Sequence, residues 1–244
     1  MYSKLSRFLV PCFIFLCATS LMAQEAGGEA PVHTKSWFDL FKATGFVGVL
    51  LLLTSMLGTS LLIMYIFAIQ EGKLKNAELM NEVETLLSEQ NFEDAYSMAE
   101  SDLTYAGKVL TAAIGRSGGG YEEARKGLEE TAAVEGFRLN AKISLLSLVG
   151  NIGPLLGLLG TVTGMISSFQ RIEVLKSPTP ADLAVGVYES LVNTTIGLFI
   201  SIVFLSSYFF LKNKLSDLTL KINTELSDLL ARTMGVGHGQ GSSS

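Results

Sequence analysis

The stretch ISLLSLVGNIGPLLGLLGTVTGMISSFQ, residues 143–170, contains no charged side chain. At about 1.5 Å per residue, a helix of this length more than crosses the ~30 Å hydrocarbon core of a bilayer. Two other stretches share this character, because residues 43–69 carry no charge and residues 183–211 carry only Glu189. Uncharged runs of this length are rare in soluble cores. They predict an all-α membrane protein with three transmembrane helices, at 43–69, 143–170 and 183–211.

The composition agrees with a membrane protein. Of the 244 residues, 48% are hydrophobic and 17% are charged, against roughly 25% charged in an average soluble domain. Mean hydropathy is +0.40, the net charge is −5 and the isoelectric point is about 5.2. A nucleic-acid-binding protein needs a basic surface to neutralise phosphates, so no nucleic-acid partner is expected. The same values disfavour a disordered chain and an ordinary soluble enzyme.

Residues 1–23 have the pattern of a signal peptide. Two basic residues precede an apolar run at 8–18, and Ala23 is a suitable residue before a cleavage point. The run is short for a membrane span, which favours a signal peptide over an additional transmembrane helix. Both cysteines lie in this segment, so a cleaved chain has no thiol for a disulfide or a metal. A short periplasmic segment is then expected at 24–42.

Lysine and arginine predict the orientation of the spans. Residues 70–142 carry eight such residues and residues 212–234 carry four, whereas the link at 171–182 carries two. The positive-inside rule therefore places 70–142 and 212–234 in the cytoplasm and the link in the periplasm. A cleaved signal peptide gives the same orientation.

Apolar residues recur with a helical period on the predicted cytoplasmic side. Residues 70–142 are expected to form a helical domain that runs into the second span without a strong breaker. Beyond the third span, Leu215, Leu218, Ile222, Leu226 and Leu229 recur at spacings of three and four. The third helix therefore continues through 212–234, and the glycine- and serine-rich residues 235–244 are expected to be a disordered tail.

Glu189 is the strongest candidate for chemistry. It is the one charged residue between Asp182 and Lys212. An acid inside a membrane span is costly, so it usually faces a bundle interior or a water-filled path and has a function. The alternative is that Glu189, which is close to the predicted outer boundary, reaches water or caps the helix.

Small and polar residues share one face of the third span with Glu189. With 100° per residue, they lie at about 40°, 80°, 100°, 120° and 140° from Glu189. They are, in that order, Asn193, Gly197, Ser190, Ser201 and Thr194. Such a face is typical of either a helix-packing seam or a hydrated path. The acid at its outer end favours the path.

The second span has a glycine face, on which three glycines fall within about 20–40° of a fourth, Gly153. The three are Gly157, Gly160 and Gly164. Glycines at this spacing allow two helix backbones to approach closely, so a packing role is expected. Pro154 frees one backbone carbonyl, which the Thr161 hydroxyl could satisfy; alternatively, that hydroxyl could face the path.

Two motifs resemble the MotA/TolQ/ExbB proton-channel family, and most closely its ExbB/TolQ branch. They are PLLGLLGTVTGMI at 154–166 and ESLVNTTIGLF at 189–199. The segment LLSEQNFEDA at 86–95 resembles the short helical hairpin of the family. The resemblance covers roughly residues 43–232. MotA-like flagellar stators have four spans, so the three spans expected here disfavour that branch.

The resemblance implies a homo-pentamer in the bacterial inner membrane, surrounding a dimer of a single-span ExbD- or TolR-like partner. Proton passage past an aspartate of that partner is expected to drive rotation and deliver force to a TonB-like envelope protein. It also implies that Thr161, Thr194 and Glu189 line the pore, with Asn193 and Ser190 beside them. Many relatives carry a small apolar residue in the place of Asn193.

The expected function is therefore a proton-channel motor subunit that energises outer-envelope transport. The alternatives are a TolQ-like or gliding-type motor subunit, or a passive membrane scaffold for a single-span partner. An enzyme is disfavoured, because no pair of groups is placed for acid–base or nucleophilic catalysis. The histidines lie singly near the two ends of the chain, so neither a metal site nor a cofactor is expected. Membrane lipid is also expected to be a partner of the three spans.

Overall fold

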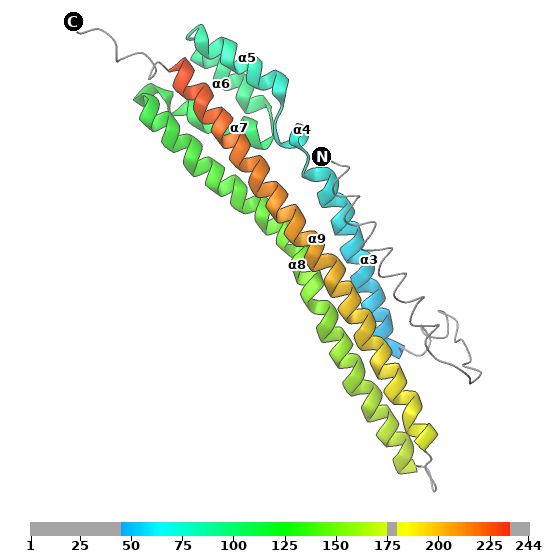
Figure 1. Cartoon of the computed structure of the whole chain (residues 1–244). Helices are drawn as coiled ribbons and strands as arrows, with labels where there is room; N and C mark the ends of the chain where they lie inside the picture. Colours follow the sequence, from blue (N-terminus) through cyan, green and yellow to red (C-terminus); the bar gives the residue numbers. More distant parts are fainter. Residues whose placement is uncertain (1–44, 175–179, 235–244) are drawn as a thin grey trace, which may run out of the picture. The chain divides into compact units, whose positions relative to one another are not determined.

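The computed structural model describes residues 45–174 and 180–234, drawn as ribbon in Figure 1. Within these residues every element is helical. The elements are α3 (Gly45–Ala68), α4 (Glu71–Leu74), α5 (Ala77–Ser88), α6 (Phe92–Ser101), α7 (Tyr105–Gly115), the 3-10 turn η1 (Ser117–Gly119), α8 (Tyr121–Val174) and α9 (Pro180–Thr233). The signal peptide expected at 1–23, the segment at 24–42 and the tail at 235–244 lie outside the described residues.

The described helices include three that are long and apolar enough to cross a membrane: α3, α8 and α9. Helices α8 and α9 contain the spans predicted at 143–170 and 183–211, and α3 lies within the span predicted at 43–69, so the expected all-α membrane fold is confirmed. All the described helices belong to one compact unit, residues 40–244.

Helices α8 and α9 form a long antiparallel pair (Figure 1). The register is visible in the contacts, since Gly150 lies against Leu205 and Gly160 lies against Asn193. Each helix has 54 residues, or about 80 Å, more than twice the thickness of the hydrocarbon core. Each span therefore continues into a polar extension without a break, as the sequence predicts.

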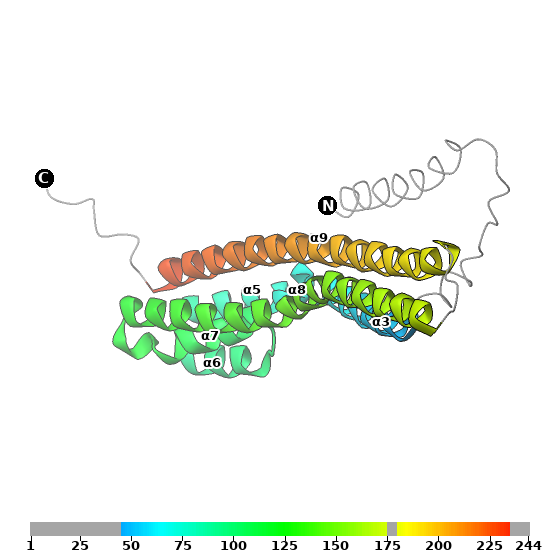
Figure 2. The ribbon, with the colours of Figure 1, turned by 90° about the horizontal axis from the view of Figure 1, so that it is seen from below.

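The other helices flank this pair. Figures 1 and 2 show α3 beside one half of the pair and α5–α7 beside the other half, where α5 contacts α9, α7 contacts both α8 and α9, and α6 packs on α5 and α7. Helix α3 packs through Gly58, which faces the ring of the buried Phe204 on α9. Its opposite face exposes apolar side chains, including Phe46, Met56 and Phe67. Such an exposed face suits contact with lipid.

Helices α5 and α6 form a hairpin, and the tight turn between them lies within residues 86–95. Gln90 has a φ of 60°, and the next amide, that of Asn91, donates to the carbonyl of Leu86 over 2.9 Å. This pattern closes the end of α5. The Asn91 side chain then caps α6 by accepting from the amide of Asp94. The turn is therefore made by local hydrogen bonds that the sequence QN supplies.

The polar extension of α9 buries its apolar stripe, and α9 contacts mainly α8, with further contacts to α5 and α7. All five stripe residues expected from their spacing, Leu215 to Leu229, are buried. A polar contact joins three helices nearby, because the Tyr105 hydroxyl of α7 donates to Asn223 Oδ1 of α9 over 2.8 Å and lies 3.5 Å from the Ala132 carbonyl of α8. Burial raises the pKa of the Tyr105 hydroxyl, so it remains a donor at neutral pH.

The docking of α3 gives the first prediction. A Cβ atom at Gly58 would lie 2.5 Å from the Phe204 ring, so Gly58→Val should lower the free energy of unfolding by about 1–3 kcal/mol. Phe204→Leu should restore part of that loss in the double variant. Gly136→Ala is the matched control, because nothing lies within 4 Å of the added Cβ. Thermal unfolding of the detergent-purified protein is measured for Gly58→Val, Phe204→Leu, the double variant and Gly136→Ala. Equal effects of Gly58→Val and Gly136→Ala would contradict this packing.

Candidate functional site

The glycine face of α8 lies directly against α9. A Cβ atom at Gly153 would lie 2.7 Å from the Gly197 carbonyl oxygen, and one at Gly157 would lie 3.0 Å from Thr194 Cα. In the other direction, a Cβ atom at Gly197 would lie 2.5 Å from the Gly153 carbonyl oxygen. The two backbones are therefore closer than any larger residue would permit, and small residues create this approach. We refer to this contact, from Gly150 to Ser168 on α8 and from Gly186 to Leu205 on α9, as the seam.

Serine hydroxyls complete the seam at the end farthest from α5–α7. Ser190 Oγ donates to the Gly186 carbonyl over 2.7 Å and lies 3.3 Å from the Thr161 carbonyl of α8. Ser168 Oγ donates to the Gly164 carbonyl and would meet a Cβ atom at Gly186. Sequence reasoning missed Ser168 and Gly186. Both could have been found, because they continue the four-residue spacing of Gly164 and Ser190.

The hydroxyl groups of Thr161 and Thr194 both meet backbone carbonyl oxygens. Thr194 Oγ1 reaches across the seam to the Gly157 carbonyl over 3.2 Å. Thr161 Oγ1 donates over 2.7 Å to the Leu158 carbonyl of its own helix. It therefore does not satisfy the carbonyl that Pro154 frees, which is that of Gly150, because its hydrogen bond is directed one turn back along α8. Both threonines are half-buried, so neither is fully enclosed by the seam.

Glu189 and Asn193 lie one helical turn apart on α9. Glu189 is half-buried, whereas Asn193 is only 4% exposed and packs on Gly160, where an added Cβ would lie 2.6 Å from Asn193 Cβ. No hydrogen-bond partner for Asn193 Oδ1 is found among the described residues. Across the same part of the chain, no group of three or more His, Cys, Asp or Glu side chains could hold a metal ion.

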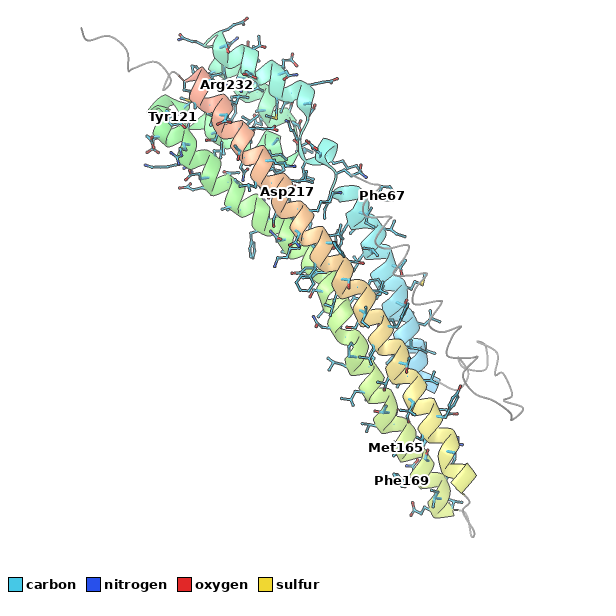
Figure 3. The ribbon with its side chains drawn as sticks, viewed as in Figure 1. Phe67, Tyr121, Met165, Phe169, Asp217 and Arg232 are labelled. Atoms are coloured by element: carbon cyan, nitrogen blue, oxygen red, sulfur yellow. The ribbon has the colours of Figure 1, made fainter. Side chains whose placement is uncertain are left out.

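The polar face of α9 thus has two parts. Ser190, Asn193 and Ser201 are buried in or beside the seam, so they belong to helix packing within the subunit. Glu189 and Thr194 are half-buried and lie at the edge of the seam. Figure 3 places Met165 and Phe169 at the end of α8 that carries this site, and Arg232 at the opposite end of the pair, beside α5. The site therefore lies in the apolar half of the pair, remote from the charged half.

The seam predicts a coupled pair of substitutions. A Cβ atom at Gly164 would meet Ser190 Oγ first, with the Gly186 carbonyl oxygen next at 3.3 Å. Gly164→Ala should therefore lower the thermal midpoint of the purified protein, and Ser190→Ala should restore much of it in the double variant. Coupling between touching residues is typically about 0.5–3 kcal/mol. Gly153→Ala is the control, since its clash is with the Gly197 backbone and Ser190→Ala cannot relieve it. Strictly additive effects of Gly164→Ala and Ser190→Ala would contradict the contact.

Several known proteins are similar to this chain in sequence, and one solved structure is similar to it in fold. The MotA/TolQ/ExbB proton channel family matches residues 96–224. A putative biopolymer transport protein, ExbB-like 3 of Synechocystis, is 32% identical over 164 residues, which is 66% of this chain and 77% of that protein. The Tol-Pal system protein TolQ of Pseudomonas aeruginosa is 40% identical over 65 residues, 27% of this chain and 28% of that protein. The biopolymer transport protein ExbB of Xanthomonas campestris is 31% identical over 119 residues, 49% of this chain and 47% of that protein.

These alignments with TolQ and ExbB span less than half the length of either relative. The solved structure of C. jejuni MotAB has a TM-score of 0.61 and 14% identity, and the match covers 94% of this chain and 89% of that chain. That similarity concerns the fold. Together, the family match, the named relatives and the three apolar helices show that this multi-pass membrane protein belongs to the ExbB/TolQ branch of the MotA/TolQ/ExbB proton channel family.

Proposed function

We propose that this protein is a proton-channel subunit of the bacterial inner membrane and that Glu189, Thr161 and Thr194 line its path. The observation that carries the proposal is the position of Glu189, a half-buried acid in a membrane helix at the edge of a seam between α8 and α9. A side chain that can ionise is costly in lipid, and it is tolerated where it faces water or a partner.

The chemistry of the three side chains suits proton movement. A carboxyl group can bind and release a proton, and a hydroxyl group can both donate and accept a hydrogen bond. Thr194 Oγ1 donates to the Gly157 carbonyl, and Thr161 Oγ1 donates to the Leu158 carbonyl. Each hydroxyl oxygen retains lone pairs that can accept a hydrogen bond. A path along these groups needs at least one further proton carrier, which we assign to a membrane aspartate of a partner.

We propose that the α4–α7 region and the polar halves of α8 and α9 lie in the cytoplasm, with residues 24–42 and the link 171–182 in the periplasm. The excess of lysine and arginine in 70–142 and 212–234 supports this orientation. A proton entering at the periplasmic side then meets Glu189 before it reaches Thr194, which lies further along α9 toward the cytoplasm.

The proposed assembly is a homo-pentamer around a dimer of an ExbD- or TolR-like single-span protein. The names of the relatives, a Tol-Pal system protein and biopolymer transport proteins, support a role in energising transport or maintenance at the cell envelope. A TonB-like protein is the proposed recipient of the force. A passive scaffold is the competing function, because much of the polar face of α9 serves the seam.

Substitution of Glu189 separates these functions. Glu189→Gln removes the proton-binding group but keeps its size, so proton uptake by liposomes containing the complex should fall by about tenfold or more. Glu173→Gln is the matched control, because Glu173 is an exposed acid near the end of α8. Both variants should assemble normally. Unchanged uptake with Glu189→Gln would refute the proton role and leave the scaffold.

The assembly is tested by native mass spectrometry of the complex, co-expressed with a single-span ExbD- or TolR-like protein. The expected mass corresponds to five copies of this chain and two of the partner. A stable monomer or dimer that does not retain the partner would contradict the proposed ring.

A further inference from the structure

Asn193 has a buried oxygen atom with no hydrogen-bond partner in the part of the chain that the structure describes. Its side chain is 4% exposed and lies against Gly160 inside the seam. An unsatisfied amide oxygen at membrane depth is costly, because lipid offers no donor. Some donor must therefore reach Asn193 Oδ1 in at least one state of the protein.

The neighbouring hydroxyls are already used. Ser190 Oγ, Thr161 Oγ1 and Thr194 Oγ1 each donate to a backbone carbonyl oxygen. The Asn193 oxygen is buried by residues of its own chain, which favours a donor from that chain. A side chain of the same helix is the nearest source of such a donor.

Glu189 meets that requirement. It precedes Asn193 by four residues on α9, and side chains at this spacing are neighbours on a helix surface. An ionised carboxylate has only acceptor atoms, so it cannot donate to Asn193 Oδ1, whereas a protonated carboxyl group has one O–H donor.

We propose that Asn193 Oδ1 accepts a hydrogen bond from the Glu189 carboxyl group when that group carries a proton. This inference rests on the proposed function, in which Glu189 binds the transported proton. Asn193 is then a positioning residue. It holds the loaded carboxyl group against the seam, and loss of the proton removes that hydrogen bond and frees the carboxylate to turn toward the path.

Infrared spectroscopy of the reconstituted complex tests the inference. The C=O stretch of protonated Glu189 is the band that Glu189→Gln removes, and a hydrogen bond lowers the frequency of a carboxyl group that donates it. Asn193→Leu keeps a similar volume without the acceptor, so the band should move to higher frequency. Proton uptake should fall by about fivefold, the scale of one net hydrogen bond.

Two further variants keep the test decisive. Asn193→Ala also removes the acceptor and is measured if Asn193→Leu fails to assemble. Ser201→Ala is the matched control, because Ser201 is a buried polar residue of α9 about three turns from Glu189, and this variant should leave the band unchanged.

The outcomes separate this inference from the proposed function. A band that does not move in either Asn193 variant, or the absence of any protonated Glu189 band, overturns the inference. If uptake still depends on Glu189 in that case, the proposed function stands alone. A shifted band supports the hydrogen bond even if Glu189→Gln leaves uptake unchanged, in which case the proposed function fails.

Discussion

The close approach of α8 and α9 is the constraint on which the rest of the structure depends. Lipid gives two apolar helices no hydrophobic reason to associate, so van der Waals contact between backbones must hold them together. Gly153 and Gly197 make that contact possible because neither has a side chain to separate the helices. The same closeness brings the Gly157 carbonyl within reach of the Thr194 hydroxyl. Packing and polar chemistry therefore use the same surface.

Because packing and polar chemistry share this surface, most of the polar face of α9 is used for helix packing and few polar residues remain at its edge. The seam buries Ser190 and Asn193 but leaves Glu189 half-exposed at its edge. An acid fully inside the seam would be enclosed by backbone and could not exchange protons with water, and an acid facing lipid would be too costly to keep ionised. In the proposed proton-channel function, the edge of a tight helix pair meets both requirements when a partner or water covers the open side.

Much of this could be predicted from the sequence. The three spans follow from uncharged runs, and the extension of α9 follows from the regular spacing of Leu215 to Leu229, because both patterns reflect local physical requirements. The helical wheel identified the polar face of α9, but it could not show that α8 covers Asn193 while Thr194 stays half-exposed. The docking of Gly58 on Phe204 was also beyond the sequence, since the rotation of α3 depends on its neighbours. The hydrogen bond from Thr161 to Leu158 was one of several choices open to a membrane hydroxyl.

The unbroken length of α8 and α9 has a mechanical consequence. Each helix runs from the site into the polar half of the pair without a non-helical residue, although Pro154 removes one backbone hydrogen bond of α8 along this route. A stiff rod transmits a rotation at one end as a displacement at the other. Glu189 and the end of α9 at Thr233 are about 65 Å apart along the helix, so a tilt of about 5° would move the far end by about 6 Å. The α5–α7 helices beside the far arm would move with such a tilt.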